Sequence, residues 1–574
     1  MRFFDYFLIL AIAIALNSCK RTIPGKVDST LKPEGEEIVR PHLVIDEENV
    51  PEPEILSTLV KQMMDTIQID QYFPSRYVDE QIEEAFTRFY SDRNYQVAWY
   101  NYKEPVPKVE ELFTLLENSW QHGLNTDDYQ LEMLKEAYDA AYDFDQIVFA
   151  ADLVKADFLF TSAYLIYANH VHAGRIDPEN VMERWVSYLE PRNLSEVLQE
   201  ALNSNSLSSY SDTLLPGHQQ YAALQKHLIK YVELEENGGW PDISAPSIMI
   251  DGNLNDALIR RLALSGDLDS TELGNLNEAV LIEALKVFQS RHQVDPSGQI
   301  DETTYQILSQ PVGNLIDKIE LNMERFRWYP QKYTGTYITV NVPEFVLRLF
   351  EEDRVEMAMK VIVGEEFEKH ATPVFSDKME YVVFSPTWNV PITIGRREFL
   401  PMLRKNPNHL ADKNMVIYKN WDKNAPEVDP TEIEWADVTK EEFNYKIVQK
   451  PGGANALGGV KFIFPNSRSI YLHDTPADYL FGKEKRDLSH GCIRVDKPVD
   501  LAEYLLDDQP EWDYSKITEF MHKKEPEWVH LNEKVPVHIM YQTLWVNADN
   551  QLVLSKDLYE YDQKQIHYIK KIES

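Results

Sequence analysis

The sequence predicts a multidomain α+β protein with a mostly helical N-terminal scaffold, a small three-helix module and a β-rich C-terminal domain that carries an inserted cap. The length of 574 residues exceeds what one hydrophobic core can organise, and 43% hydrophobic residues with 11% aromatics is typical of a globular chain. Apolar residues recur with helical spacing in the first half of the chain and alternate with the period of a strand after about residue 331.

The N-terminus is typical of an exported chain. Arg2 precedes an apolar run over residues 7–16, which is too short for a stable membrane span and suits the core of a signal peptide. The string LNSC at 16–19 resembles the bacterial lipobox, so residues 1–18 are predicted to be a lipoprotein signal peptide and Cys19 the lipidated residue. An ordinary secretory signal with an incidental cysteine is the alternative. We expect a periplasmic protein anchored by lipid to a membrane, the outer membrane of a Gram-negative bacterium.

Residues 19–55 are rich in Pro and Glu and poor in large apolar residues, which predicts a disordered tether. Residues 56–250 follow a helical period and are expected to form the scaffold domain. His170 and His172 lie two residues apart in this region, but no further His or Cys stands at ligand spacing. We therefore interpret both histidines as structural and predict no metal site.

Residues 251–312 are predicted to form a compact helical unit. Leu281, Leu285 and Phe288 fall on one helix face, and Asp301 can cap the helix that follows. The string ALKVFQSRHQVDPSGQIDETTYQIL (284–308) resembles the small three-helix peptidoglycan-binding module. A packing module that has lost ligand binding is the alternative interpretation.

Short alternating segments predict a β-rich domain over residues 331–555. A charged stretch at 391–450 interrupts the strands and is interpreted as an inserted cap. The predicted strands include TYITVNV, EMAMKVIVG, EYVVFSPTW, VKFIFPN and SIYLHD.

Composition and missing motifs disfavour several classes of function. The formal net charge is −37, from 57 Lys and Arg against 94 Asp and Glu, so a nucleic-acid partner is not expected. The sequence contains no GxxxxGK[ST], GxGxxG, HExxH or CxxC string. We expect neither a nucleotide nor another cofactor.

Cys492 is one of only two cysteines, and it has no disulfide partner if Cys19 is lipidated. A thiol needs a neighbouring base to act as a nucleophile at neutral pH. His473 lies 19 residues earlier on a predicted strand, where the period of two places Tyr471 on the same face. Gly491 permits a tight turn whose backbone N–H groups could form an oxyanion hole, to which the Tyr471 hydroxyl could add.

These residues predict a cysteine acyl-transfer enzyme of the Cys–His type. A buried, inert thiol is the structural alternative. A papain-like protease fits poorly, because its cysteine usually precedes its histidine by a long interval, whereas His473 comes before Cys492.

The combination of YLHDTP at 471–476 with SHGCIR at 489–494 resembles the signature of the L,D-transpeptidases, which have a YkuD-type catalytic domain. The order of parts resembles the large subtype of that family, with a helical scaffold, a peptidoglycan-binding-like module and a capped catalytic domain. Further matching strings are FYSDRNYQVAW, HGLNTDDY, PTWNVP, GGANALGGVKFIFPN and VHIMYQTLWV.

The resemblance implies a role for each residue of the signature. Cys492 would be the nucleophile and His473 its base, with Gly491 and Tyr471 at the oxyanion site. Arg494 would orient the substrate, or it would form a structural ion pair with Asp496 or another carboxylate. Two further residues would shape the pocket, Ser489 and His490, and for His490 a role as second base is the alternative.

The implied reaction begins with attack of Cys492 on the third residue of a tetrapeptide stem and release of D-Ala. The side-chain amine of a second stem then resolves the thioester into a 3-3 cross-link of peptidoglycan. Peptidoglycan stem peptides would be the partners, and a carbapenem adduct at Cys492 is expected.

Alternatives with the same nucleophile are an L,D-carboxypeptidase and an enzyme that attaches protein to peptidoglycan. A non-catalytic peptidoglycan-binding lipoprotein is the alternative of another class, and labelling of the thiol would separate it from the enzymes.

Overall fold

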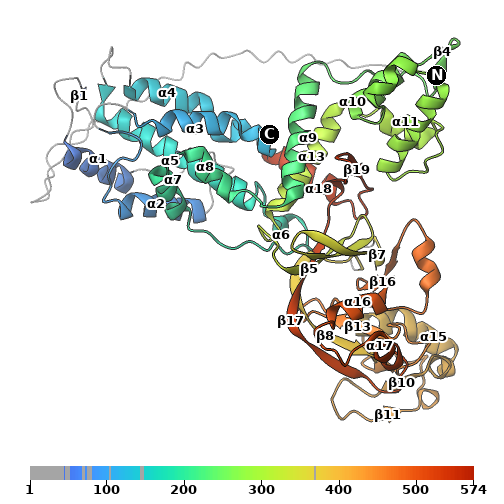
Figure 1. Cartoon of the computed structure of the whole chain (residues 1–574). Coiled ribbons are helices and arrows are strands. Elements are labelled where there is room, and N and C mark those ends of the chain that lie inside the picture. Colours follow the sequence, from blue (N-terminus) through green and yellow to red (C-terminus); the bar gives the residue numbers. More distant parts are fainter. Residues whose placement is uncertain are drawn as a thin grey trace, which may run out of the picture.

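The computed structural model describes residues 44–45, 52–66, 72–73, 80–101, 105–142, 148–366 and 370–573. The predicted signal peptide, the lipidation residue Cys19 and most of the predicted tether lie outside the described residues. The multidomain α+β prediction is confirmed, since a helical N-terminal region precedes a β-rich C-terminal region (Figure 1).

The scaffold is a helical assembly around one core, with the long helix α5 at its centre. Residues on all sides of α5 are buried, as expected for a helix that its neighbours surround. Tyr90 and Asp157 are joined inside this core by a 2.7 Å hydrogen bond. The helices are α1 Pro53–Thr66, α2 Glu80–Asp92, α3 Lys108–Glu117, α4 Leu131–Tyr142, α5 Ala150–Ala173, α6 Pro178–Val181, α7 Leu194–Asn203 and α8 Leu207–Ser211.

One segment of the predicted tether has regular structure. Strand β1 (Val44–Ile45) pairs antiparallel with β2 (Val148–Phe149), and α1 begins at Pro53. The apolar pair of β1 can satisfy its backbone groups on a neighbouring strand, which the composition of the surrounding residues does not reveal.

Helices α9 (Gln219–Glu236) and α13 (Val312–Arg327) pack together between the scaffold and the β-rich domain (Figure 1). Tyr221, Leu224 and Leu228 of α9 belong to the core of the β-rich domain rather than to the scaffold core. The apolar face of α9 therefore packs on α13.

The small module has a core of its own. It includes Leu258, Leu281 and Phe288, and Asp301 caps the last helix by accepting the Thr304 N–H at 2.8 Å. Its elements are β3 Met249–Ile250, β4 Asn253–Leu254, α10 Asp256–Ser265, α11 Glu278–Arg291 and α12 Glu302–Leu308.

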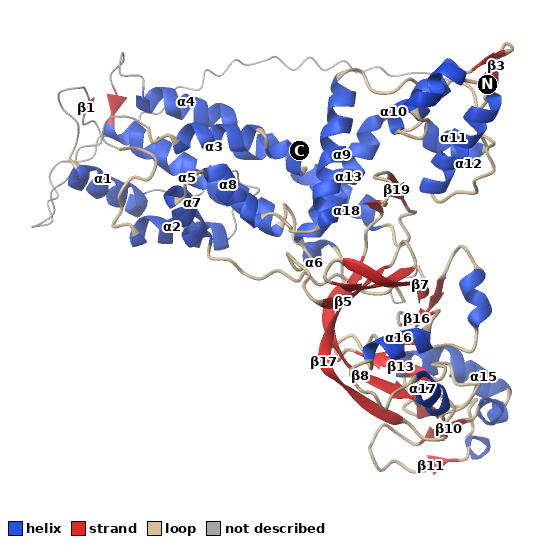
Figure 2. Cartoon of the chain, in the orientation of Figure 1, coloured by secondary structure: helices blue, strands red, loops and turns tan. Residues whose placement is uncertain are grey.

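The β-rich domain is built on a mixed sheet with the strand order β15-β7-β16-β14-β13-β8-β17-β5-β6. Strand β7 also pairs with β6, so the hydrogen-bond ladder closes on itself around the core. Figure 2 shows β5, β7, β8, β13 and β17 of this domain in red. The strands are β5 Thr336–Asn341, β6 Val346–Glu351, β7 Arg354–Gly364, β8 Phe375–Phe384, β13 Val460–Ile463, β14 Leu472–His473, β15 Asp487–Ser489, β16 Ile493–Val495 and β17 Glu527–Met540.

Further elements complete this domain. They are α16 Pro498–Leu505, α17 Tyr514–Phe520, β18 Leu544–Val546, β19 Leu552–Leu554 and α18 Tyr561–Glu573.

The chain between β8 and β13 forms a separate layer with its own small core around Leu400, Trp435 and Phe443. Its sheet starts at Trp388, so the insertion begins slightly before the predicted residue 391. Its elements are β9 Trp388–Asn389, α14 Ile392–Ile394, the π-helix Gly395–Phe399, α15 Leu400–Lys405, β10 Met415–Tyr418, β11 Glu427–Val428 and β12 Lys446–Gln449.

Within the described residues, no helix has the length and apolar character needed to cross a membrane.

Candidate active site

The loop that carries Cys492 joins β15 to β16 and is fixed by hydrogen bonds. The Ser489 hydroxyl accepts the Gly491 N–H at 3.1 Å and donates to the backbone oxygen of Cys492 at 2.5 Å. The Thr372 hydroxyl donates to the Gly491 oxygen at 2.9 Å. Gly491 has a φ of +117°, which residues with a side chain rarely adopt. The loop therefore depends on glycine at this position to present the thiol.

Hydrogen bonds of the loop show which backbone N–H groups around the thiol are already occupied. The Gly491 N–H is occupied by Ser489, and the Ile493 N–H donates to the Tyr471 oxygen at 3.2 Å. Among the hydrogen bonds of the described residues, the Cys492 N–H has no acceptor. The donors around the thiol are this N–H together with the backbone N–H and the hydroxyl of Tyr471, both of which interact with the thiol.

His473 is buried on β14, next to the strand that follows Cys492. Strands β14 and β16 run parallel, with His473 opposite Arg494. The Nδ1 atom of His473 lies 2.6 Å from the backbone oxygen of Asp474, which can only accept, so Nδ1 carries the hydrogen. Nε2 is therefore the proton acceptor of the ring. The rings of Tyr471 and His473 lie 5.7 Å apart between centroids, in agreement with the predicted shared face.

The turn after His473 is held by the Asp474 carboxylate. This group accepts the N–H of Gly459 and that of Thr475, each at 2.7 Å. A Cβ atom at Gly458 would lie 2.3 Å from Asp474 Cγ, so the backbone passes too close for any side chain. The glycine pair before β13 thereby fixes the carbonyl that orients His473.

The other two predicted residues contact different parts of the domain. His490 is exposed and has Nε2 2.5 Å from Glu398 Oε1 of the insertion. Its ring lies 4.6 Å from that of His370. Arg494 donates weakly to the Leu488 oxygen at 3.4 Å, and its Nε has no partner. Within the described residues, the alternative ion pair of Arg494 with Asp496 is not formed.

Residues 335–537 match the family model of the L,D-transpeptidase catalytic domain, YkuD, and this match contains Cys492, His473 and the whole loop. The chain carries an L,D-transpeptidase catalytic domain. Residues 84–228 match a second family, described as a scaffold domain. A Haemophilus influenzae protein named "Putative L,D-transpeptidase" is 33% identical over 252 residues. That similarity covers 44% of this chain and 49% of the relative, so the chain spans about half the length of the curated relative that it matches.

The thiol and the imidazole of the L,D-transpeptidase domain are both neutral at rest. Burial raises the pKa of Cys492 to about 11, although Tyr471, Lys461 and Arg494 favour the thiolate. Burial, together with the cations Arg494 and Lys461, lowers the pKa of His473 to about 3. Near pH 7 the thiol is therefore protonated and the imidazole unprotonated. The thiol donates to the Ser469 backbone oxygen at 3.8 Å.

Three residues of the L,D-transpeptidase domain that shape this site were missed by the sequence analysis. They are Lys461, Thr372 and Asp474. Lys461 lies in the string GGVKFIFPN, but only the strand register shows that it stands opposite His473. Thr372 precedes the thiol by 120 residues, and no local pattern indicates its contact with Gly491.

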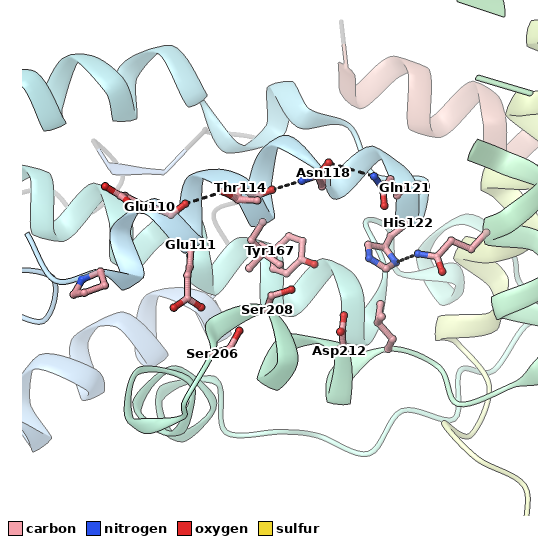
Figure 3. Close-up of a pocket in the computed structure, with 14 residues that line it drawn as sticks. Glu110, Glu111, Thr114, Asn118, Gln121, His122, Tyr167, Ser206, Ser208 and Asp212 are labelled. Carbon is pink, nitrogen blue, oxygen red and sulfur yellow. Dashed lines mark hydrogen bonds between the residues drawn. The ribbon is translucent and has the colours of Figure 1, made fainter. Parts of the chain in front are cut away.

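A polar cavity of about 880 Å³ lies in the scaffold, away from the L,D-transpeptidase domain (Figure 3). Its walls include Glu110, Glu111 and Asp212, and they include no residue after 225. The His122 ring accepts from Gln225 at 3.1 Å at one end. His170 and His172 lie on α5 of the same scaffold, where they contact the Tyr129 hydroxyl and the Glu190 backbone oxygen.

Proposed function

We propose that the chain is a cell-wall L,D-transpeptidase that forms 3-3 cross-links between peptidoglycan stem peptides. The observation that supports this most directly is the free thiol of Cys492 on a glycine-dependent turn. This turn leads into β16, which pairs with the strand of His473, and the Nδ1 atom of His473 is hydrogen-bonded to the Asp474 oxygen. Both residues lie within the matched catalytic domain. The stem peptide is the substrate that this family implies.

In the first half-reaction, Cys492 Sγ attacks the carbonyl carbon of the third stem residue while His473 Nε2 takes the thiol proton. The Cys492 N–H and the Tyr471 hydroxyl donate to the oxyanion of the tetrahedral intermediate. The C–N bond then breaks, His473 returns its proton to the leaving amine, and D-Ala departs. A thioester on Cys492 remains.

In the second half-reaction, the side-chain amine of another stem attacks the thioester and gives a proton to His473. The C–S bond breaks, and the Cys492 sulfur recovers a proton from His473. The thioester conserves the energy of the amide bond, so the exchange needs no nucleotide. Water in place of the amine gives a carboxypeptidase, and a protein amine gives protein attachment.

Location and inhibition form part of the same proposal. Lipid on Cys19 would anchor the chain to the outer membrane on its periplasmic side, within reach of the wall. A carbapenem would acylate Cys492, and mass spectrometry of the intact protein tests this directly. The peptidoglycan-binding-like module would hold the polymer near the thiol.

Incubation of the full-length protein with disaccharide tetrapeptide, followed by mass spectrometry of the products, tests the proposed function. We expect a dimer lighter by one D-Ala from the wild type and none from Cys492→Ala. Tripeptide without a dimer would replace the proposal with an L,D-carboxypeptidase. Absence of both products would favour a non-catalytic wall-binding protein.

A further inference from the structure

Lys461, His473 and Arg494 form one row across three neighbouring strands. Lys461 of β13 stands opposite His473 of β14, and His473 stands opposite Arg494 of β16. Residues directly opposite on adjacent strands share a face, so both cations flank the imidazole on the side of the sheet away from the core. Val460 and Phe462, the neighbours of Lys461, point into the core and are fully buried.

Two aromatic rings lie close to the Lys461 ammonium. Its Nζ lies 5.5 Å from the centre of the Trp528 ring and 5.7 Å from that of Tyr471. These rings shield the ammonium from water, and their cation–π attraction offsets only part of the free energy lost when the charge is removed from water. Burial consequently lowers the pKa of Lys461, and the nearby thiol is the group that opposes this shift.

Neither cation has a carboxylate partner. Within the part of the chain that the structure describes, the side-chain ammonium of Lys461 forms no hydrogen bond or ion pair. Arg494 has the single weak bond to the Leu488 oxygen and an unpartnered, buried Nε. Among the other buried arginines of the described residues, Arg291 is paired with Asp267 and Arg325 with Asp562, whereas Arg261 has no carboxylate partner and lies over the Trp240 ring. Two unpaired, partly buried cations in a chain of net charge −37 therefore require an explanation.

We propose that Lys461, with Arg494 as the second cation, forms a carboxylate subsite that recognises the amino acid on the amine side of the bond that Cys492 cleaves. This inference rests on the proposed function. A C-terminal D-Ala places its carboxylate two bonds from the leaving nitrogen, close to the scissile carbonyl and hence to the thiol. Lys461 would bind that carboxylate and would orient the leaving amine toward His473.

The same subsite would select the acceptor. The incoming amine must occupy the position that the leaving amine vacates, because the two half-reactions are the reverse of one another at this centre. An acceptor whose amine-bearing carbon also carries a carboxylate would then be preferred over a plain primary alkylamine. The diamino acid of the stem would accordingly be one with a carboxylate beside its side-chain amine.

The experiment compares two donors, the tetrapeptide stem with a free C-terminal carboxylate and the same stem with a C-terminal carboxamide. Release of the fourth residue is measured as kcat/KM for the full-length wild type, Lys461→Met, Lys461→Arg and Lys378→Met. Lys378 lies exposed on β8 of the same sheet and serves as the matched control. Thermal unfolding of each variant is measured alongside.

We expect the wild type to prefer the carboxylate donor by about 10- to 100-fold, the range of one charged hydrogen bond. Lys461→Met should lose this preference by slowing the carboxylate donor alone, while Lys461→Arg keeps most of it and Lys378→Met keeps all of it. Equal slowing of both donors in Lys461→Met would overturn the subsite, because it would mean that Lys461 acts on the thiol. Equal kcat/KM values of the wild type for the two donors would also overturn the subsite. Release from neither donor by the wild type would overturn the proposed function itself.

Discussion

At the scale of single residues, the chemistry depends on two neutral partners rather than on a preformed ion pair. The pKa of Cys492 lies at about 11 and that of His473 at about 3, both mainly because of burial. In the proposed mechanism, the thiol therefore loses its proton to Nε2 only as it attacks the carbonyl carbon, when the developing charge is shared with the oxyanion donors. A neutral thiol is also less open to oxidation, since the reactive thiolate is scarce at rest.

The pH dependence of alkylation tests this state of the thiol. The thiolate fraction of a group with a pKa of about 11 rises tenfold for each unit of pH through the neutral range. Iodoacetamide labelling of Cys492, followed by peptide mapping to separate it from Cys19, should accelerate steadily from pH 6 to pH 9. A rate that is level over this range would indicate a preformed thiolate–imidazolium pair and would contradict the neutral resting state.

Cys492, His473 and Tyr471 could be proposed as a candidate site from the sequence, because one loop and one strand carry all three. Two features could not be predicted at this scale. The position of Lys461 opposite His473 depends on which strands pair and in which register. The use of the Gly491 N–H by Ser489, rather than by an oxyanion, depends on side-chain geometry within the turn.

At the scale of elements, the strands position the candidate site residues, and short turns fix the orientation of their side chains. Strand β14 has only two residues, yet it lies between β13 and β16 and sets the distance between His473 and its neighbours. The alternation of apolar residues was enough to predict β13 and β14 but not the three-residue strand β16. It could not reveal that the insertion carries its own four-stranded sheet, because the pairing partners β9 and β12 lie more than fifty residues apart.

A substitution at Gly458 tests the link between the glycine pair and His473. Gly458→Ala introduces a Cβ 2.3 Å from Asp474 Cγ at a φ of +61°, so the turn must move. We expect a loss of stability of about 1–3 kcal/mol in urea unfolding, together with slower D-Ala release. Gly453→Ala, in the same loop with no atom within 4 Å, is the control. Equal behaviour of the two variants would show that the turn does not depend on this close approach.

At the scale of the whole molecule, α13 connects the scaffold to the L,D-transpeptidase domain. Arg327 is ion-paired with Glu324 at 2.6 Å and donates to the backbone oxygen of His122 in the scaffold. Arg325 is fully buried and ion-paired with Asp562 of α18 at 2.7 Å. The sequence predicted a helical region before a β-rich one, but an apolar helix face such as that of α9 does not show which core it joins.

Removal of the Arg325 guanidinium tests this connection. Arg325→Met leaves the buried Asp562 with the Thr543 hydroxyl at 3.0 Å and Lys318 at 3.9 Å. We expect the free energy of unfolding to fall by about 3–5 kcal/mol, the usual cost of breaking a buried pair. Arg354→Met breaks exposed ion pairs on β7 and should cost less than about 1 kcal/mol. If both variants lost a similarly small free energy of unfolding, the buried pair between α13 and α18 would not be an important structural link.

The mass of a trapped intermediate tests the account most directly. Full-length protein is mixed with disaccharide tetrapeptide, quenched in acid within the first turnovers and digested for peptide mass spectrometry. We predict that the peptide containing Cys492 becomes heavier by the mass of the donor less one D-Ala, and that hydroxylamine removes this adduct as it does a thioester. Release of D-Ala by Cys492→Ala at the wild-type rate, or an acyl group on any other residue, would contradict the assignment of Cys492 as the nucleophile.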